Sequence, residues 1–270
     1  MTVERPRDTW AQGDLYEPYI GRWSRLVARE FLAWLAIPPE KDWLDVGCGT
    51  GALTQTVLES AHPRSIQGID PSTAFIEHAR SRLQGDPRAS FEVGDAMALP
   101  RASSTVDAAV SGLALNFIAD PARAASEMTR VTRAGGTVAA YVWDYAGKME
   151  MLRYFFDAVL TLDPDLAHLD EGQRFPICRP EPLASTFAQA GLHDVETRAI
   201  DVPTRFRNFD DYWSPFLGGQ GPAPSYVVSL DYERQTILRD FIRSRLPIAK
   251  DGSIDLVARA WAVRGRKAAG

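Results

Sequence analysis

The sequence predicts an α/β fold in which helices cover both faces of a mostly parallel sheet. Strand-length apolar runs alternate with helix-length amphipathic runs through the first half of the chain, and a glycine-rich turn follows the first strand. Such alternation is typical of βαβ units with right-handed crossovers. The 270 residues are 45% hydrophobic, which is ample for a buried core.

The first half of the chain contains five expected strands. They are residues 42–46, 65–69, 90–93, 106–111 and 137–143. The expected helices are residues 22–36, a segment carrying Leu53, Val57 and Leu58, residues 72–83, and residues 121–131. Ser72 and the pair Asp120-Pro121 supply helix N-terminal signals, and Gly135-Gly136 are expected to stop the last of these helices.

The second half departs from this rhythm. Helices are expected at residues 148–162 and 183–190, and strands at 195–202 and 253–263. The proline-containing stretch 179–182 is interpreted as a connection, and residues 203–250 as an insertion of loops and helices. The acidic residues Asp163, Asp165 and Asp170 are interpreted as a solvated face.

Charge and composition exclude several classes of protein. The net charge of −5 disfavours binding to nucleic acid, which depends on clustered Lys and Arg. Cys48 and Cys178 are too few for a disulfide framework or a zinc site, and no spacing of His, Cys or carboxylates predicts a metal. We expect no signal peptide and no membrane insertion, and therefore a cytoplasmic protein. The oligomeric state is not predicted.

The glycine turn reads Asp45-Val46-Gly47-Cys48-Gly49-Thr50-Gly51 between a strand and a helix, as in a Rossmann-like unit. Glycines there allow positive φ values and a close approach of a ligand to the backbone, and Cys48 is a small residue that fits between them. The same residues also satisfy the dinucleotide pattern G-x-G-x-x-G/A. The turn can therefore belong to a nicotinamide-dependent oxidoreductase. It can also be a tight turn that binds no ligand.

Acidic residues end three successive strands. Asp45 is placed to face a cationic amino group, which favours a cofactor that carries an amino acid. Asp70 can accept hydrogen bonds from both ribose hydroxyls, in a nicotinamide or an adenosylmethionine site alike. Asp95 can accept from an adenine amino group, with the backbone N–H of Ala96 beside it.

With these motifs in order, the chain resembles the class I S-adenosylmethionine-dependent methyltransferases of the type 11 group, related to the ubiquinone and menaquinone biosynthesis methyltransferases. The resemblance rests on WLDVGCGTGALT, GIDPS, FEVGDAMALP and VSGLALNFIADPARAASEMTRVTRAGGTVAAYVWD, within residues 42–144. It implies a seven-stranded Rossmann-like sheet with an antiparallel last strand and helical cap insertions. It also implies transfer of a methyl group from S-adenosyl-L-methionine to a small-molecule acceptor by in-line displacement, giving S-adenosylhomocysteine.

The resemblance also implies roles for individual residues. The methionine part of the cofactor would lie along Asp45 and the turn Gly47, Cys48, Gly49 and Gly51, the ribose on Asp70, and the adenine beside Pro71, Asp95 and Ala96, with Leu113 against the cofactor. Residues 16–25 resemble the N-terminal cofactor-covering segment of the family. There Arg22 would pair with the cofactor carboxylate, and Tyr19 or Trp23 would face the sulfonium. A solvated Arg22 and a core Trp23 are the alternatives.

The acceptor site is less defined. Residues 111–117 lack the Asn/Asp-Pro-Pro-aromatic motif of nucleic-acid amino-methyltransferases, which favours a small molecule. Asn116 and Phe117 are candidates for the pocket floor, although Asn116 can equally cap or brace the loop. The aromatic candidates for the pocket wall are Trp143, Tyr145 and Trp213, with packing in the core as their alternative.

No catalytic residue is identified. Methyl transfer depends mainly on positioning, and none of the four histidines lies in a catalytic motif, although His168 is a weak candidate. A cofactor-binding protein without transfer activity therefore stays open. We expect a single domain of residues 1–270, with a cofactor-covering segment at 1–40, a cofactor-binding core at 41–144, and cap insertions at 145–182 and 203–250.

Overall fold

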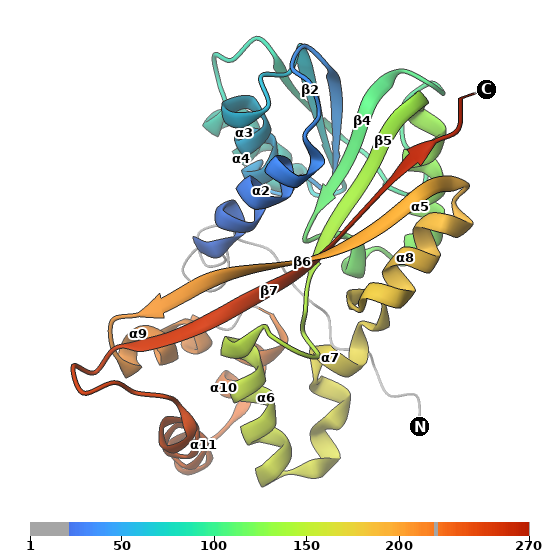
Figure 1. Ribbon diagram of the computed structural model, residues 1–270. Helices are drawn as coiled ribbons and strands as arrows, with labels where there is room; N and C mark the ends of the chain where they lie inside the picture. Colours follow the sequence, from blue (N-terminus) through green and yellow to red (C-terminus); the bar gives the residue numbers. More distant parts are fainter. Residues whose placement is uncertain (1–21, 219–220, 270) are drawn as a thin grey trace. The chain divides into compact units, whose positions relative to one another are not determined.

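The computed structural model describes residues 22–218 and 221–269, and within them seven strands form one sheet. The strand order is β3-β2-β1-β4-β5-β7-β6 (Figure 1). The strands are β1 (Asp42–Val46), β2 (Ser65–Asp70), β3 (Ala89–Val93), β4 (Val106–Gly112), β5 (Thr132–Trp143), β6 (Leu192–Phe206) and β7 (Ile254–Lys267). The predicted α/β fold is confirmed.

The first five strands are parallel, so their carboxyl ends share one edge of the sheet. β1 pairs with β2 and β4, β2 with β3, and β4 with β5, all in parallel register. β7 pairs antiparallel with β5, with Trp143 opposite Ala260. This is the antiparallel last strand that the family resemblance implies.

The chain divides into two compact units. Among the described residues, one comprises 24–143, 177–200 and 260–269, and the other comprises 22–23, 144–176, 201–218 and 221–259. The first, which we call the sheet unit, carries the helices α2 (Arg22–Leu35), α3 (Ala52–Ser60), α4 (Thr73–Arg82), α5 (Pro121–Val131) and α8 (Pro180–Gln189). The second, the helical unit, carries α6 (Glu150–Leu162), α7 (Glu171–Arg174), α9 (Phe209–Trp213), α10 (Pro222–Ser229) and α11 (Tyr232–Arg245). The expected single domain with two cap insertions stays a prediction.

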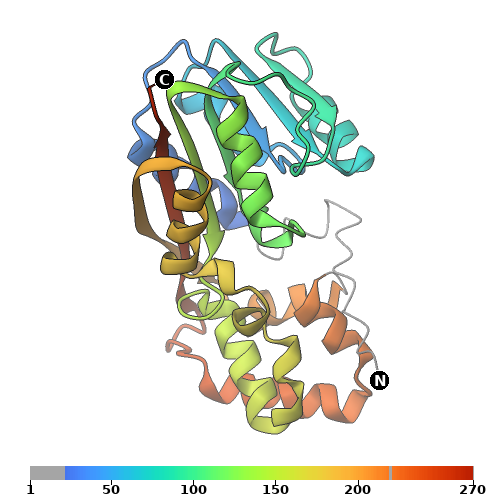
Figure 2. The ribbon, with the colours of Figure 1, turned by 90° about the vertical axis from the view of Figure 1, so that its right-hand side faces the viewer.

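Short 3₁₀ turns complete both units: η2 (Leu115–Phe117), η3 (Pro164–Leu169), η4 (Pro176–Cys178) and η5 (Ser214–Gly218). α10 and α11 pack on α6 in the helical unit (Figure 2). No helix among the described residues is long and apolar enough to cross a membrane.

In one part of the core of the sheet unit, α4 packs against β3 and the glycine turn. Cys48, Ile76, Ala79 and Phe91 form one buried cluster. Gly68 of β2 lies beneath it, where an added Cβ would come within 2.8 Å of the Cys48 sulfur and closer still to the Phe91 ring. The cluster is therefore packed without room for one further methyl group.

Aromatic rings form the core of the helical unit. Phe155 and Phe216 stack with ring centroids 4.7 Å apart, and the Tyr212 hydroxyl donates to the Met151 carbonyl at 2.8 Å. All four residues are buried. A stacked aromatic pair of this kind stabilises the fold beyond the effect of the area that it buries.

Three local expectations are wrong. β5 begins at Thr132 and contains Gly135-Gly136, because α5 already ends at Val131, where the backbone of Thr132 turns extended. The stretch 179–182 opens α8, since Pro180 occupies the first helical turn, which needs no proline N–H. Asp170 is 4% exposed, because Arg153 of α6 donates to its carboxylate at 2.7 Å. Asp163 and Asp165 are exposed, as predicted.

Candidate functional site

The glycine turn follows β1 at the carboxyl edge of the sheet. The backbone N–H groups of Gly47 and Cys48 both donate to the Ile69 carbonyl, at 2.8 and 3.0 Å, which fixes the turn against β2. Gly47 has φ +72°, and a Cβ there would lie 2.5 Å from the Cβ of Ala114. Gly49 has φ +51° and nothing within 4 Å of an added Cβ. The turn is therefore supported from below at Gly47 and has open space at Gly49.

Asp45 is fully buried at the end of β1. Its Oδ2 accepts from the Thr54 hydroxyl of α3 at 2.7 Å, whereas Oδ1 has no hydrogen-bond partner. Burial, which disfavours the charged form, raises the pKa of Asp45 to about 7. A buried carboxylate with one unused oxygen is suited to a cationic partner.

Asp70, which ends β2, is tied to the same turn. Its Oδ2 accepts from the N–H of Gly49 at 3.0 Å and its Oδ1 from the N–H of Ser72 at 2.9 Å. Desolvation raises its pKa. Each carboxylate oxygen keeps a further lone pair, so Asp70 can still accept hydrogen bonds from a diol.

Asp95 and Ala96 lie just beyond the end of β3, whose Val93 pairs with Asp70. Asp95 is exposed, and its Oδ1 accepts from the N–H of Met97 at 2.8 Å. Ala96 is buried, and Pro71 after β2 is exposed. The predicted adenine-binding residues thus follow two neighbouring strand ends.

The segment after β4 closes over the glycine turn. Leu113 has φ +58°, a conformation that costs a residue with a side chain about 1 to 2 kcal/mol, and its N–H donates to the Tyr141 carbonyl at 2.8 Å. Ala114 contacts the turn at Gly47. Sequence analysis missed Ala114 and Thr54, because nothing in the sequence distinguishes these small residues. Their importance follows from the contacts of Ala114 with Gly47 and of Thr54 with Asp45.

Asn116, in η2, is 7% exposed, and neither its Oδ1 nor its Nδ2 has a hydrogen-bond partner. Phe117 is 38% exposed. Trp143 is buried at the end of β5, and its indole N–H has no partner. These three acceptor-site candidates belong to the sheet unit.

The other two acceptor-site candidates, Tyr145 and Trp213, belong to the helical unit. Trp213 is stacked parallel to Phe209 with centroids 6.4 Å apart, and Tyr145 meets Phe175 at 5.8 Å. Both are buried, so they take part in the core, which was the alternative interpretation. Their role toward an acceptor stays a prediction.

The N-terminal candidates are described only in part. Tyr19 lies outside the described residues, and of Arg22 only the backbone, at the start of α2, is described. Trp23 is 4% exposed and meets Phe206 edge-on at 5.3 Å, the core contact that was the alternative for it. His168 is exposed, with its Nδ1 3.1 Å from the Asp165 carbonyl oxygen.

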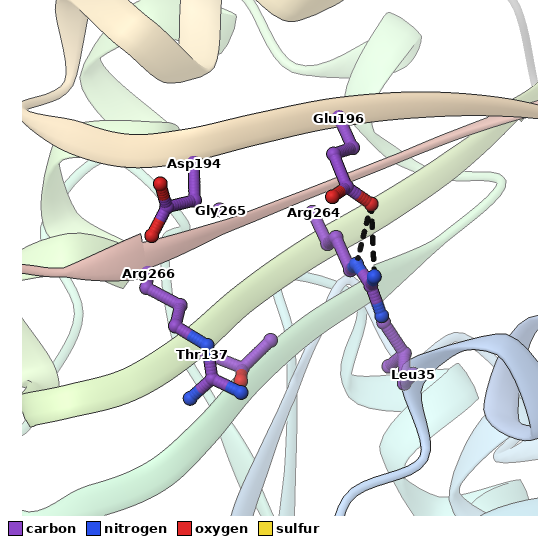
Figure 3. A pocket seen from close by; sticks show the side chains of 7 residues that line it. All are labelled: Leu35, Thr137, Asp194, Glu196, Arg264, Gly265 and Arg266. Carbon is purple, nitrogen blue, oxygen red and sulfur yellow. Dashed lines mark hydrogen bonds and ion pairs between the residues drawn. The ribbon is translucent and has the colours of Figure 1, made fainter.

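A shallow pocket lies elsewhere on the sheet unit, between β7, the start of β6 and Thr137 near the start of β5 (Figure 3). Arg264 forms an ion pair with Glu196 at 2.8 Å and lies over the Trp34 ring. Thr137 and Trp143 are at opposite ends of the strand segment paired with β7, so this pocket is remote from the carboxyl edge. Arg264 thus connects β7 to β6 through the ion pair and to α2 through the Trp34 ring.

Comparison with known proteins identifies the chain. Residues 44–140 match the family model described as a methyltransferase domain. The chain is 32% identical over 182 residues to a demethylmenaquinone methyltransferase of Roseiflexus castenholzii, covering 62% of this chain and 75% of that protein. It is 25% identical over 243 residues to the 2-methyl-6-phytyl-1,4-hydroquinone methyltransferase of Synechocystis, covering 82% and 75%.

Two further matches bear on extent and fold. An uncharacterised transposon protein of Streptomyces fradiae is 37% identical over 99 residues, which span 36% of this chain and only 29% of that protein. The crystal structure of YcgJ from Bacillus subtilis superposes with a TM-score of 0.60 at 19% identity, covering 91% of this chain and 99% of that one.

The chain belongs to the class I S-adenosylmethionine-dependent methyltransferases of the type 11 group. Its cofactor is S-adenosyl-L-methionine, and it transfers a methyl group to a small-molecule acceptor. The nicotinamide oxidoreductase and the non-catalytic binding protein are not favoured.

Proposed function

We propose that this methyltransferase acts on a quinol-type hydroxyarene, an aromatic ring activated by ring hydroxyls. The observation that carries the proposal is the activity for which its relatives are named, since they include a demethylmenaquinone methyltransferase and a 2-methyl-6-phytyl-1,4-hydroquinone methyltransferase. Both act on aromatic rings that bear oxygen substituents.

The cofactor roles that we propose are those of the strand-end residues. Asp45 would hold the amino group with its unused oxygen, and Asp70 the ribose diol. The open space at Gly49 would take the methionine portion beside Gly47, Cys48 and Gly51, and Pro71, Asp95 and Ala96 would border the adenine. Leu113 would lie against the cofactor. The roles that the family resemblance implies for Tyr19, Arg22 and Trp23 stay predictions. A fully buried carboxyl group with one orphaned oxygen fits a cation better than a pyrophosphate.

When bound, the cofactor supplies an electrophilic methyl carbon: the acceptor's nucleophilic atom takes the methyl, the S–C electron pair stays on sulfur, and the acceptor loses a proton to water. The chain's own task is positioning, because positive charge disperses in the transition state and needs no strong anion beside the sulfur.

The acceptor class is tested by incubating the purified protein with S-adenosyl-L-methionine under anaerobic, reducing conditions. The acceptors are a prenylated 1,4-naphthohydroquinone, 1,4-benzohydroquinone, histamine and phosphoethanolamine, with S-adenosylhomocysteine release and product mass as readouts. We expect methylated quinol and no methylated amine. Turnover of only the amines would overturn the proposal, and a reaction without protein controls for spontaneous chemistry.

We also place the protein in the cytoplasm. The chain has two cysteines, Cys48 and Cys178, and both are buried. So small a number of cysteines is typical of a protein in a reducing compartment. Fractionation of the native host, with the protein in the soluble cytosolic fraction, is the expected result. Recovery in the extracytoplasmic fraction would contradict it.

A further inference from the structure

The side-chain amide of Asn116 is buried and forms no hydrogen bond in the fold. The residue is 93% buried, since 7% of it is exposed, and both ends of its amide lack hydrogen-bond partners. A buried amide normally finds partners, because burial strips its water away. An amide kept in this state is a candidate for binding a ligand.

The loop around Asn116 does not need that amide. The N–H of Phe117 donates to the Ala114 carbonyl at 3.0 Å, and the N–H of Leu113 donates to the Tyr141 carbonyl, so backbone bonds hold the turn. The N-cap position of η2 is Ala114, which offers no side-chain bond. By contrast, Asn208 caps α9, because its Oδ1 accepts from the N–H of Asp211 at 2.9 Å. The capping role considered for Asn116 therefore has no hydrogen bond to support it.

The position of Asn116 associates it with the cofactor edge. It follows the carboxyl end of β4, two residues after Ala114, which contacts Gly47 of the glycine turn. Parallel strands bring their carboxyl ends to one edge, where α/β proteins bind their ligands. The amide thus lies in the segment between β4 and α5, whose Ala114 contacts the glycine turn and whose Leu113 N–H donates to Tyr141 of β5.

We infer that Asn116 recognises a hydroxyl group of the methyl acceptor and selects hydroxyarenes over their methyl ethers and over carboxylates. The inference rests on the proposed function and names the residue that forms hydrogen bonds with the acceptor's hydroxyl group. A hydroxyl both donates and accepts, so it can serve Oδ1 and Nδ2 of one amide. A methyl ether or a carboxylate can serve only Nδ2, and an ammonium only Oδ1.

The first test is thermal unfolding of Asn116→Leu beside Asn208→Leu, without ligand. Leucine has nearly the shape of asparagine, and removing an unpaired buried amide removes its desolvation penalty. We expect the Tm of Asn116→Leu to stay equal or rise, and that of Asn208→Leu to fall by about 2 to 4 °C through loss of the cap. A comparable fall in Asn116→Leu would mean that the amide braces the fold, and would overturn the inference.

The second test is equilibrium dialysis of 1-naphthol, 1-methoxynaphthalene and 1-naphthoate against protein saturated with S-adenosylhomocysteine. The wild type and Asn208→Leu are expected to bind the naphthol at least about tenfold more tightly than the other two, because a buried polar site rejects a group that leaves it unpaired. In Asn116→Leu this preference should shrink to about twofold or less. A preference that survives in Asn116→Leu, or a wild type that prefers the naphthoate or binds none of the three, would refute the inference.

The two proposals fail separately. If quinols are methylated while Asn116→Leu keeps the naphthol preference, only the role of Asn116 is wrong. If the preference depends on Asn116 while quinols are not methylated, only the quinol acceptor is wrong.

Discussion

The two ends of strand β1 each carry an aspartate, and the surroundings of these two aspartates are opposite in character. At its start, Asp42 accepts from Arg64 and Ser65 and also pairs with Arg133, and the Arg64 guanidinium holds the pKa of this carboxyl well below its usual range. At its end, Asp45 accepts from Thr54 alone, its Oδ1 has no partner, and burial raises its pKa to about 7. Asp42 and Asp45 are only three positions apart, yet Asp42 has several partners and one oxygen of Asp45 has none.

The difference shows where the sheet unit is built for stability and where for binding. At the amino edge, Asp107 accepts from the N–H of Asp42 and pairs with Arg133 at 3.0 Å, so the charges compensate one another. At the carboxyl edge, Asp45 and Asn116 keep unpaired polar atoms, and Leu113 keeps a positive φ. Strain and unpaired groups concentrate at functional sites because a ligand is what compensates them.

The largest effect is expected for Gly47→Ala. The new Cβ would meet Ala114 at 2.5 Å in a left-handed backbone, so we expect a loss of about 3 to 4 kcal/mol in the free energy of unfolding. Urea denaturation measures it, and S-adenosylhomocysteine binding should be lost as well. Gly49→Ala is the matched control, since it shares the positive φ but has open space, and should lose only about 1 kcal/mol. Equal losses in both variants would mean that Ala114 does not support the turn.

A smaller effect of opposite sign is expected for Asp45→Asn. Because the folded pKa of about 7 exceeds the unfolded value near 4, the folded state binds more protons, and stability falls as pH rises from about 4 to 7. Removing the charge should therefore stabilise the ligand-free protein by about 1 to 3 kcal/mol at pH 8 and hardly at all at pH 4 to 5. The same variant should bind S-adenosylhomocysteine at least about tenfold more weakly by calorimetry. A gain independent of pH would contradict this origin.

The smallest effect is expected for Asp42→Asn, at the other end of the strand. Its pKa is lowered in the folded state, so its contribution is present above the unfolded value near 4 and is lost as pH falls below it. We expect a loss of about 1 kcal/mol at pH 7, measured by urea denaturation, that shrinks below pH 4. S-adenosylhomocysteine binding should not change. Weakened binding would show that the two ends of β1 are coupled.

Local sequence signals were sufficient to predict those features of the fold that depend on residues close together in the chain. Ser72 and Asp120 cap the helices that the sequence assigns to them, and the strand ends at Asp45 and Asp70 follow from the glycine turn and the alternation of elements. Turn chemistry and periodicity act over a few residues, so they are readable from one sequence.

What sequence analysis missed depends on partners distant in the chain. Asp170 is paired because Arg153 comes from another helix, and Asp42 gains Arg133 from 91 residues away. The unpaired amide of Asn116 is likewise visible only once its surroundings are known.

The packing of Gly68 beneath Cys48 and Phe91 has a consequence for how this protein can change over generations. A larger residue at Gly68 has no space unless the Cys48 sulfur or the Phe91 ring is first made smaller. Substitutions at the three positions are therefore tolerated only in certain orders. Because Cys48 is part of the glycine turn, the same restriction applies to substitutions in that turn.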